Sequence, residues 1–372
     1  MSGFGLDNLP YGVFSSDGGA PRAGVRYGDG VFDLSEMDDV FGSPTLNAFM
    51  AQGREAWRDA HARIRDSVAD AQLIPLDEVE LHLPFAVADY VDFYSSLEHA
   101  TNLGRLFRPD SEPLLPNWRR LPVGYHGRAG TIVVSGTPVV RPLGQSKPPD
   151  VQEPVFGPSR RLDIELELGF VIGTPSRQGE LVPLDRTLEH VFGVVLVNDW
   201  SARDLQAWEY QPLGPFLGKS FATSIGAWVT PLEALEPVRV EGEQQDPPPL
   251  DYLRAQPWAY DVGLEVELNG ETISRTSSRH LYWSIEQQIA HLTVNGASLR
   301  TGDLLASGTI SGSEPGSRGS LIELAWNGAE PLRLADGSTR TFLEDGDEVV
   351  LRGGAGGVEL GEVRGVIQPA PR

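Results

Sequence analysis

The stretch Leu162-Asp163-Ile164-Glu165-Leu166-Glu167-Leu168 alternates strictly between apolar and acidic residues. A period of two is typical of a β-strand, whose successive side chains point to opposite faces. Asp163, Glu165 and Glu167 would then share one face, and the apolar side chains would fill the other. By itself the pattern favours an amphipathic strand with a solvated acidic face, since antiparallel sheets commonly expose one face to water.

The next predicted strand changes that interpretation. Val191 to Val197 is largely apolar and ends in Asn198-Asp199, so Asp199 should lie at a buried strand terminus. A helix is predicted to follow from Ser201 to Tyr210. Spacings of four, three and four residues place a mixed polar stripe on one helical face, made of Asp199, Arg203, Gln206 and Tyr210. An acid, a cation, an amide and a phenol together are more typical of a site than of a solvated face.

If Asp199 met Glu165 and Glu167, the three carboxylates would repel one another unless a cation joined them. Ligands that are all oxygen favour a hard ion, Ca²⁺ or Mg²⁺, and carboxylates accept both. The chain has no cysteine, which excludes thiolate metal sites, disulfides and a cysteine nucleophile.

The composition is that of a globular protein of one large or two ordinary domains: 372 residues, 40% hydrophobic and 22% charged. A formal net charge of -22 disfavours nucleic acid and anionic membranes as partners. No apolar run is long enough to span a bilayer. The first residues lack the basic start and apolar core of a signal peptide, so we expect a cytoplasmic protein.

The chain is predicted to form two domains, 1–85 and 86–372. Its first ~40 residues are Gly-rich and typical of short strands and turns. Ser43-Pro44 resembles a helix start, with the helix running to about Ala71, and Pro75 to Pro84 resembles a linker.

The remainder is predicted to be mainly β-structure. Ser135 to Pro138 is a turn between two short strands, and Asn269-Gly270 and Asn327-Gly328 are hairpin signals. Ser284-Ile285-Glu286-Gln287 resembles a capping box that opens a helix to about Val294.

Only Lys147 and Lys219 are lysine in a chain whose other basic residues are arginine. Codon preference can explain the bias. A lysine kept in this background can also mark a site that needs a compact ammonium.

The segment Asp92-Phe93-Tyr94-Ser95-Ser96-Leu97-Glu98-His99-Ala100-Thr101-Asn102 combines an acid, a phenol and a histidine. A lone histidine is more often structural, although histidine is also the usual general base. This segment resembles the fumarylacetoacetase family, and the resemblance covers nearly the whole chain. Further motifs carry it: 115–118 (LPNW), 122–128 (PVGYHGR), 198–204 (NDWSARD), 212–220 (PLGPFLGKS) and 307–312 (SGTISG).

The resemblance implies a mainly β fold with some α-structure: a small N-terminal SH3-like barrel, then a large mixed β-sandwich roll, assembled as a homodimer. It implies that Ca²⁺ or Mg²⁺ is held by Asp92, Glu165, Glu167 and Asp199, with Lys219 and Thr223 close to the ion. It implies catalytic roles for His99 as general base, Glu323 as its orienting partner, and Arg203, Gln206 and Lys219 around the oxyanion. The implied substrate contacts are Tyr94, Arg108, Tyr125, Gln206, Tyr210 and Thr309.

From the residues alone, Tyr125 and Trp118 could instead be packing aromatics. Glu323 lies between apolar residues in a predicted strand, so it could be a satisfied core acid.

The activity that the resemblance implies is metal-dependent hydrolysis of 4-fumarylacetoacetate, a small diketo acid, to fumarate and acetoacetate. This is the last step of tyrosine and phenylalanine breakdown. One alternative is a hydrolase, hydratase or decarboxylase of the same superfamily acting on another diketo or 2-oxo acid. Another is a metal-stabilised binding protein, which would need neither His99 with Glu323 nor a retained lysine.

Overall fold

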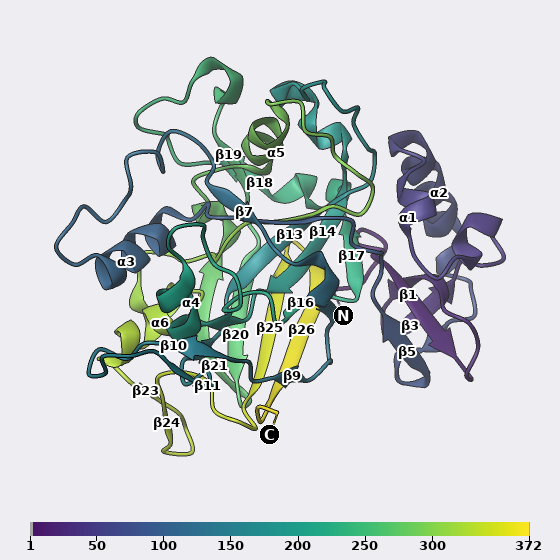
Figure 1. The fold of residues 1–372 in the computed structure, drawn as a ribbon. Helices are drawn as coiled ribbons and strands as arrows, with labels where there is room; N and C mark the ends of the chain where they lie inside the picture. The colour runs from purple at the N-terminus through teal and green to yellow at the C-terminus, as the bar shows by residue number, and fades with distance from the viewer. Residues whose placement is uncertain (1–2, 372) are drawn as a thin grey trace.

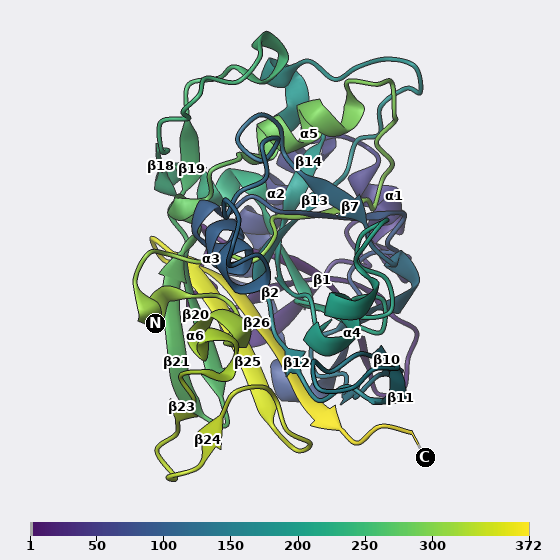
Figure 2. The same ribbon diagram turned by 60° about the vertical axis from the view of Figure 1, so that its left-hand side comes forward.

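The computed structural model describes residues 3–371. Its 23% helix and 32% strand confirm the predicted mainly β class, with an N-terminal region and a large C-terminal β region (Figures 1 and 2). The largest sheet has 13 strands. In chain order these are β1 (Tyr11–Ser16), β2 (Arg22–Tyr27), β3 (Gly30–Asp33), β4 (Ile74–Pro75), β5 (Val79–His82), β6 (Tyr90–Phe93), β7 (Gly124–His126), β8 (Ile132–Val134), β13 (Leu166–Ile172), β14 (Val191–Asn198), β16 (Thr223–Ile225), β17 (Trp228–Pro231) and β22 (Leu304–Ala306).

The apolar strand β14 lies at the centre of the molecule and is buried on both faces. Val194 and Leu196 belong to a core shared with the second sheet, whereas Val195 and Val197 belong to a core shared with the N-terminal region. This double burial explains why the strand is continuously apolar rather than alternating. The second sheet has five strands: β21 (Glu271–Ser277), β20 (Gly263–Leu268), β25 (Glu348–Ala355), β26 (Val358–Gln368) and β9 (Val139–Val140).

The N-terminal region packs beside this core (Figure 1). Strand β1 pairs with β2 and β5, consistent with the expected SH3-like unit, and it also pairs with β17 of the C-terminal region. The sheet therefore continues across the predicted domain boundary near residue 85, and that division stays a prediction.

Two local predictions in this region were wrong. The helix predicted from Ser43 is two helices, α1 (Asn47–Met50) and α2 (Arg54–Val68), because Gly53 adopts φ 87° between them and breaks the helical path. The segment from Pro75 to Pro84 is not a free linker, since it contributes β5 to the N-terminal sheet.

Four helices and four small two-stranded sheets complete the fold. The helices are α3 (Leu97–Phe107), α4 (Arg203–Glu209), α5 (Ile285–Thr293) and α6 (Leu321–Leu324). The strand pairs are β10 (Leu143–Ser146) with β11 (Val155–Pro158), β12 (Leu162–Asp163) with β15 (Ser201–Ala202), β18 (Arg239–Glu241) with β19 (Trp258–Tyr260), and β23 (Leu332–Arg333) with β24 (Thr339–Arg340).

The turn predictions had mixed outcomes. Asn269-Gly270 connects β20 to β21 as a hairpin, and Ser284 forms the predicted capping box at the start of α5. Asn327-Gly328 lies in a short 3₁₀ turn instead, where Asn327 takes φ 58°. The strands on either side of Ser135 to Pro138 do not pair with each other, because β8 pairs with β16 and β9 with β26. Within residues 3–371, no helix is long and apolar enough to cross a membrane.

Candidate active site

A cavity of about 430 Å³ opens where α3, α4 and β7 meet the end of the central sheet. Larger hollows lie elsewhere, one of about 970 Å³ beside Trp258. We assign the chemistry to the smaller cavity because its lining gathers most of the site residues that the sequence singled out. These are Asp92, Tyr94, His99, Arg108, Tyr125, Glu165, Arg203, Gln206, Tyr210, Lys219 and Thr309.

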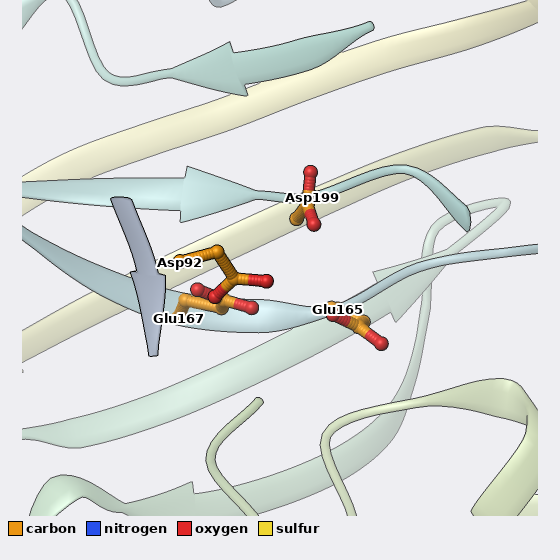
Figure 3. Close-up of side chains that lie close together, drawn as sticks. All are labelled: Asp92, Glu165, Glu167 and Asp199. Carbon is orange, nitrogen blue, oxygen red and sulfur yellow. The ribbon is translucent and has the colours of Figure 1, made fainter. Parts of the chain in front are cut away.

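Four carboxylates form a compact cluster (Figure 3), and two of them, Asp92 and Glu165, line this cavity. One oxygen from each of Asp92, Glu165, Glu167 and Asp199 lies within 4.8 Å of the others. Asp92 comes from β6, Glu167 from β13, and Asp199 directly follows β14. Hydrogen bonds hold the strand ends in place, since Asp199 N donates to Glu165 O over 3.2 Å and Glu165 N to Asn198 Oδ1 over 3.1 Å.

The acidic face of the alternating strand is therefore not solvated, which corrects the interpretation that the pattern alone favoured. Asp163 and Glu167 are completely buried and Glu165 is 5% exposed. The strand is also interrupted between β12 and β13, near Ile164 and Glu165. Glu165 and Glu167 join the cluster, whereas Asp163 faces Arg203 and lies outside it.

Two cations and a hydroxyl contact one side of the cluster. Lys219 Nζ donates to Glu165 Oε2 and Asp199 Oδ2, both over 2.5 Å. Arg203 Nη1 lies 2.7 Å from Glu165 Oε1. Thr223 Oγ1 donates to Asp199 Oδ1 over 2.8 Å. Lys219 and Thr223 thus reach the cluster by donating hydrogen bonds to its carboxylates.

These contacts shift the pKa values of the cluster acids in different directions. Burial acts to raise the pKa of Glu165, but the charges of Lys219 and Arg203 outweigh it and hold that pKa well below its usual range. Burial and the neighbouring carboxylates raise the pKa values of Asp92 and Glu167 well above theirs. Burial also raises the pKa of Asp199, although Lys219 opposes the shift.

Two carboxylate oxygens of the cluster lack hydrogen-bond partners, and they show that a cation fits here. Asp92 Oδ1 and Glu167 Oε1 are buried and accept no hydrogen bond from the residues that the structure describes. Buried polar atoms are normally paired. Two unpaired carboxylate oxygens within an all-oxygen donor set match the preference of a hard divalent ion.

His99, which lines the cavity, forms a buried pair with Glu323. His99 Nδ1 lies 2.6 Å from Glu323 Oε2, and the two side chains are 3% and 0% exposed. Ser96 caps helix α3 and holds the backbone of His99. Burial raises the pKa of Glu323, but His99 and several hydrogen bonds outweigh it and lower that pKa below its usual value. The ionised carboxylate therefore accepts the Nδ1 proton and leaves Nε2 as the basic nitrogen.

Glu323 lies in the short helix α6 rather than in a strand, which corrects that prediction. Three further groups hold its carboxylate, and the sequence reasoning gave none of them a role. Asn102 Nδ2 donates over 3.0 Å, Ser311 Oγ over 2.9 Å and Ser320 Oγ over 2.7 Å. Asn102 follows His99 by three residues on α3, and that spacing could have revealed it as a neighbour on the same helical face.

Arg203 and Gln206 lie between the cluster and the open cavity, on α4. Arg203 Nη1 donates to Gln206 Oε1 over 3.1 Å, while Arg203 Nη2 has no partner among residues 3–371. Arg203 is 2% exposed, so its guanidinium acts in a largely dry environment. Hydrogen-bond donors arranged in this way are suited to stabilising negative charge that develops on a bound molecule.

The remaining predicted contacts surround the cavity. The Tyr94 ring packs edge-on against His99 with centroids 5.4 Å apart, and Tyr125 Oη donates to Asp199 Oδ2 over 3.3 Å. Arg108 Nη2 donates to Pro113 O over 2.8 Å. Thr309 Oγ1 is buried without a partner in the described chain. Trp118 is buried and bonds the backbone of Tyr94, so it supports the wall rather than lining it.

Comparison with known proteins gives a consistent result over the whole chain. Residues 89–368 match the family model "Fumarylacetoacetate (FAA) hydrolase C-terminal", and residues 7–84 match "Fumarylacetoacetase N-terminal". The chain is 49% identical to fumarylacetoacetase of Rattus norvegicus and 47% identical to that of Homo sapiens, with 99% of this chain and 97% of each relative covered. Fumarylacetoacetase of Arabidopsis thaliana is 45% identical over 100% of this chain and 97% of its own.

Solved structures show the same fold at low sequence identity. Fumarylacetoacetate hydrolase from Exiguobacterium antarcticum superposes with a TM-score of 0.62 at 20% identity, covering 97% of this chain and 99% of that one. Maleylpyruvate hydrolase from Sphingobium sp. SYK-6, in complex with manganese (II) ion and pyruvate, gives a TM-score of 0.57 at 16% identity, covering 98% and 100%.

Proposed function

The chain belongs to the fumarylacetoacetase family and hydrolyses 4-fumarylacetoacetate to fumarate and acetoacetate, and on that premise we propose how its cavity cleaves the carbon–carbon bond. One observation carries the proposal. A carboxylate cluster suited to a divalent ion and a histidine–glutamate pair meet at a single cavity, whose lining includes Asp92 and Glu165 of the cluster and His99 of the pair. The reaction requires both, since it needs an activated water and a stabilised carbanionic leaving group.

Asp92, Glu165, Glu167 and Asp199 would hold the ion, which we propose to be Ca²⁺ or Mg²⁺. When bound, it would supply Lewis-acid stabilisation to the oxygens of the 1,3-diketone. The Mn²⁺ in the maleylpyruvate hydrolase structure supports a divalent ion in this fold. Lys219 and Thr223 would support the ion indirectly, because a protonated amine has no lone pair and each group donates to the carboxylates.

The general base is His99. Glu323 accepts its Nδ1 proton over 2.6 Å and keeps the ring in one tautomer. His99 Nε2 takes a proton from water, and the hydroxide attacks the ketone carbon on the fumaryl side. When the carbon–carbon bond breaks, the imidazolium returns that proton to the leaving carbon, and the new carboxyl group of fumarate releases the second proton of the water to solvent.

Arg203, Gln206 and Lys219 stabilise the oxyanion of the tetrahedral intermediate. The unpaired Nη2 of Arg203 supports this role, since it remains available to a bound oxygen. Arg108 is suited to a terminal carboxylate of the dianionic substrate, because its fork can bind bidentately. Tyr94, Tyr125, Tyr210 and Thr309 complete the substrate contacts.

We further propose a cytoplasmic homodimer. Apolar side chains are exposed near the cavity mouth, with Leu213 at 96% and Phe216 at 70% exposure. An exposed apolar patch of this kind is typical of an interface. Light scattering during gel filtration tests the dimer, and a monomeric mass at micromolar concentration would contradict it.

The decisive experiment follows loss of the diketo-enol absorbance of fumarylacetoacetate, with chromatography of the products. Activity should disappear in EDTA and return with Ca²⁺ or Mg²⁺. EDTA-resistant turnover would contradict the proposed role of the ion. Release of products other than fumarate and acetoacetate would show that a different bond is cleaved.

A further inference from the structure

Asp163 is the one acid of the alternating stretch to which the reaction above assigns no role. It is completely buried, it lies outside the four-carboxylate cluster, and it does not line the cavity. Burying an ionisable side chain costs free energy unless good partners compensate it. The hydrogen-bond partners of Asp163 therefore indicate its structural role.

Its two oxygens accept four hydrogen bonds. Oδ2 accepts from Arg203 Nε over 2.8 Å and from Ile322 N over 3.1 Å. Oδ1 accepts from Leu321 N over 2.7 Å and from Ile164 N over 2.8 Å. These donors come from three separate segments: the strand that carries Asp163, helix α4 and helix α6.

The contact with Arg203 orients the guanidinium. With Nε bound to Asp163, Nη1 reaches Glu165 over 2.7 Å and Gln206 over 3.1 Å, and Nη2 has no partner in the described chain. A planar fork held at its Nε edge and at Nη1 cannot rotate freely about its long side chain.

The contacts with Leu321 and Ile322 fix the first turn of α6, and the next residue is Glu323. Glu323 in turn holds His99 over 2.6 Å. A single carboxylate thus links the side chain proposed to stabilise the oxyanion with the segment that positions the proposed general base. Catalytic groups need to be held to within fractions of an ångström, and shared anchors of this kind achieve that.

We propose that Asp163 is a positioning residue that sets the orientation of Arg203 and the placement of α6 relative to each other. The inference rests on the proposed function, because it takes the roles of Arg203 and His99 from there. A carboxylate is required since all four contacts are donors. An asparagine would place its own N–H₂ against at least one of them.

The test is Asp163→Asn in the full-length protein loaded with Ca²⁺. Misplacing an oxyanion donor without removing the cavity should lower kcat by about 10–100-fold and leave KM within about threefold. Calcium affinity, measured by calorimetry, should fall less than it does in Glu165→Gln, since Asp163 is not among the proposed ligands and reaches Glu165 only through Arg203.

A double-mutant cycle distinguishes positioning from a general loss of structure. In an Arg203→Lys background, measured by single turnover, Asp163→Asn should cost less than about threefold because the group that it orients has already changed. Full additivity of the two effects would overturn the proposal, as would a loss of calcium affinity as large as that of Glu165→Gln.

Asp204→Asn is the matched control. Asp204 also accepts a side-chain and a backbone hydrogen bond, from Ser159 Oγ and Arg160 N, and it lies beside Arg203 on α4 without an ion pair to it. Its kcat should stay within about threefold of wild type.

If Asp163→Asn does not fold, Asp163→Glu keeps the charge but displaces the carboxylate, and it should show the same fall in kcat. Wild-type kcat in a folded Asp163 variant refutes the positioning role, whereas an inactive wild type refutes the proposed function.

A crystal structure of Asp163→Asn gives a readout independent of activity. The Arg203 guanidinium should rotate away from its contact with Gln206. An unchanged Arg203 in a variant with reduced kcat would overturn the inference.

Discussion

Two sets of buried carboxylates, Glu323 beside His99 and the cluster acids Asp92 and Glu167, have pKa values shifted in opposite directions. Glu323 accepts hydrogen bonds from His99, Asn102, Ser311 and Ser320, and these partners outweigh burial and lower its pKa. Asp92 and Glu167 are also buried, but each keeps an oxygen without a partner in the described chain and has a raised pKa. Burial is common to both sets, so the difference lies in the donors around each carboxylate.

This difference in donors matches the different roles proposed for Glu323 and for the carboxylate cluster. A fully bonded carboxylate stays ionised and holds a histidine in one tautomer without changing its own state. A cluster left short of donors instead retains affinity for a cation that the chain itself does not supply. The following predictions test the histidine–glutamate pair and the carboxylate cluster separately, beginning with the largest effect.

The largest effect should come from removing the base. His99→Ala should lower kcat by about 10³-fold, since general base catalysis is typically worth this much. Calcium binding should persist because the carboxylate cluster is intact. Stopped-flow assays and a calcium titration measure the two properties separately, and near-normal turnover would mean that another group takes the proton.

Lys219→Arg should lower kcat by about 10²-fold although the charge is conserved. The ammonium of Lys219 donates to both Glu165 and Asp199 from a nearly closed space, and a planar guanidinium cannot reproduce that geometry. Steady-state kinetics at saturating Ca²⁺ provide the measurement. Unchanged kcat would show that only the charge of Lys219 matters.

Replacement of glutamate by glutamine should have opposite effects on stability at Glu323 and at Glu167. Glu323→Gln should lower the free energy of unfolding by about 2–3 kcal/mol, because an amide opposes donors that a carboxylate accepts. In metal-free protein, Glu167→Gln should raise it by about 1 kcal/mol, since one repelling charge is removed. Denaturant unfolding in EDTA measures both, and a shift of the same sign would contradict the comparison.

Calcium binding should release protons and tighten as pH rises. In metal-free protein the pKa values of Asp92, Glu167 and Asp199 are raised by burial. The folded state therefore binds protons that the unfolded chain releases, and its metal-free stability increases as pH falls through these raised values. Because Ca²⁺ requires the ionised forms, its affinity should rise with pH across the range in which these raised carboxyl groups lose their protons. Calorimetry in two buffers of different ionisation enthalpy measures the proton release, and a pH-independent affinity would argue against the raised values.

The smallest effect is expected at the other lysine. Lys147 is exposed and lies 5.7 Å from the Trp208 ring, and within the described residues it forms no ion pair with either carboxylate set. Lys147→Arg should change the free energy of unfolding by less than about 0.5 kcal/mol and leave kcat unaltered. It serves as the matched control for Lys219→Arg, and a comparable loss of activity would undermine the distinction between the two lysines.

Part of the site could be predicted from local pattern. Alternation placed Glu165 and Glu167 on one face, the apolar run placed Asp199 at a buried strand end, and helical spacing aligned Arg203 with Gln206. The position of Asp92 could not be derived in this way. It joins the cluster through parallel pairing of β6 with β22, whose Ala306 lies far along the chain. The resemblance to a family proposed Asp92, and its role as a ligand stays a prediction.

Local signals also failed for physical reasons. Asn327-Gly328 has the composition of a hairpin turn, but it lies in a 3₁₀ turn, because the residues before it form the buried helix α6 instead of a strand. Ser43-Pro44 resembles a helix start, yet the chain turns at Gly53 and divides the helix. In the first case the fold outweighed a local turn signal, whereas in the second the glycine itself, which readily adopts a positive φ, ended the helix.

Periodicity and side-chain chemistry could be inferred from the residues alone. They predict a β-rich chain, an apolar central strand, and acids spaced to share one face. The role of each acid, by contrast, depends on the folded surroundings of its side chain. Asp163, Glu165 and Glu167 are equivalent in the alternating pattern, but Asp163 meets Arg203 and the backbone of α6, Glu165 meets two cations, and Glu167 retains an unpaired oxygen. A buried carboxylate takes its state from the donors within hydrogen-bonding distance, and those donors come from other segments: Arg203 and Lys219 lie 40 and 54 residues along the chain from Asp163 and Glu165, and Leu321 and Gly308 lie 158 and 141 residues from Asp163 and Glu167.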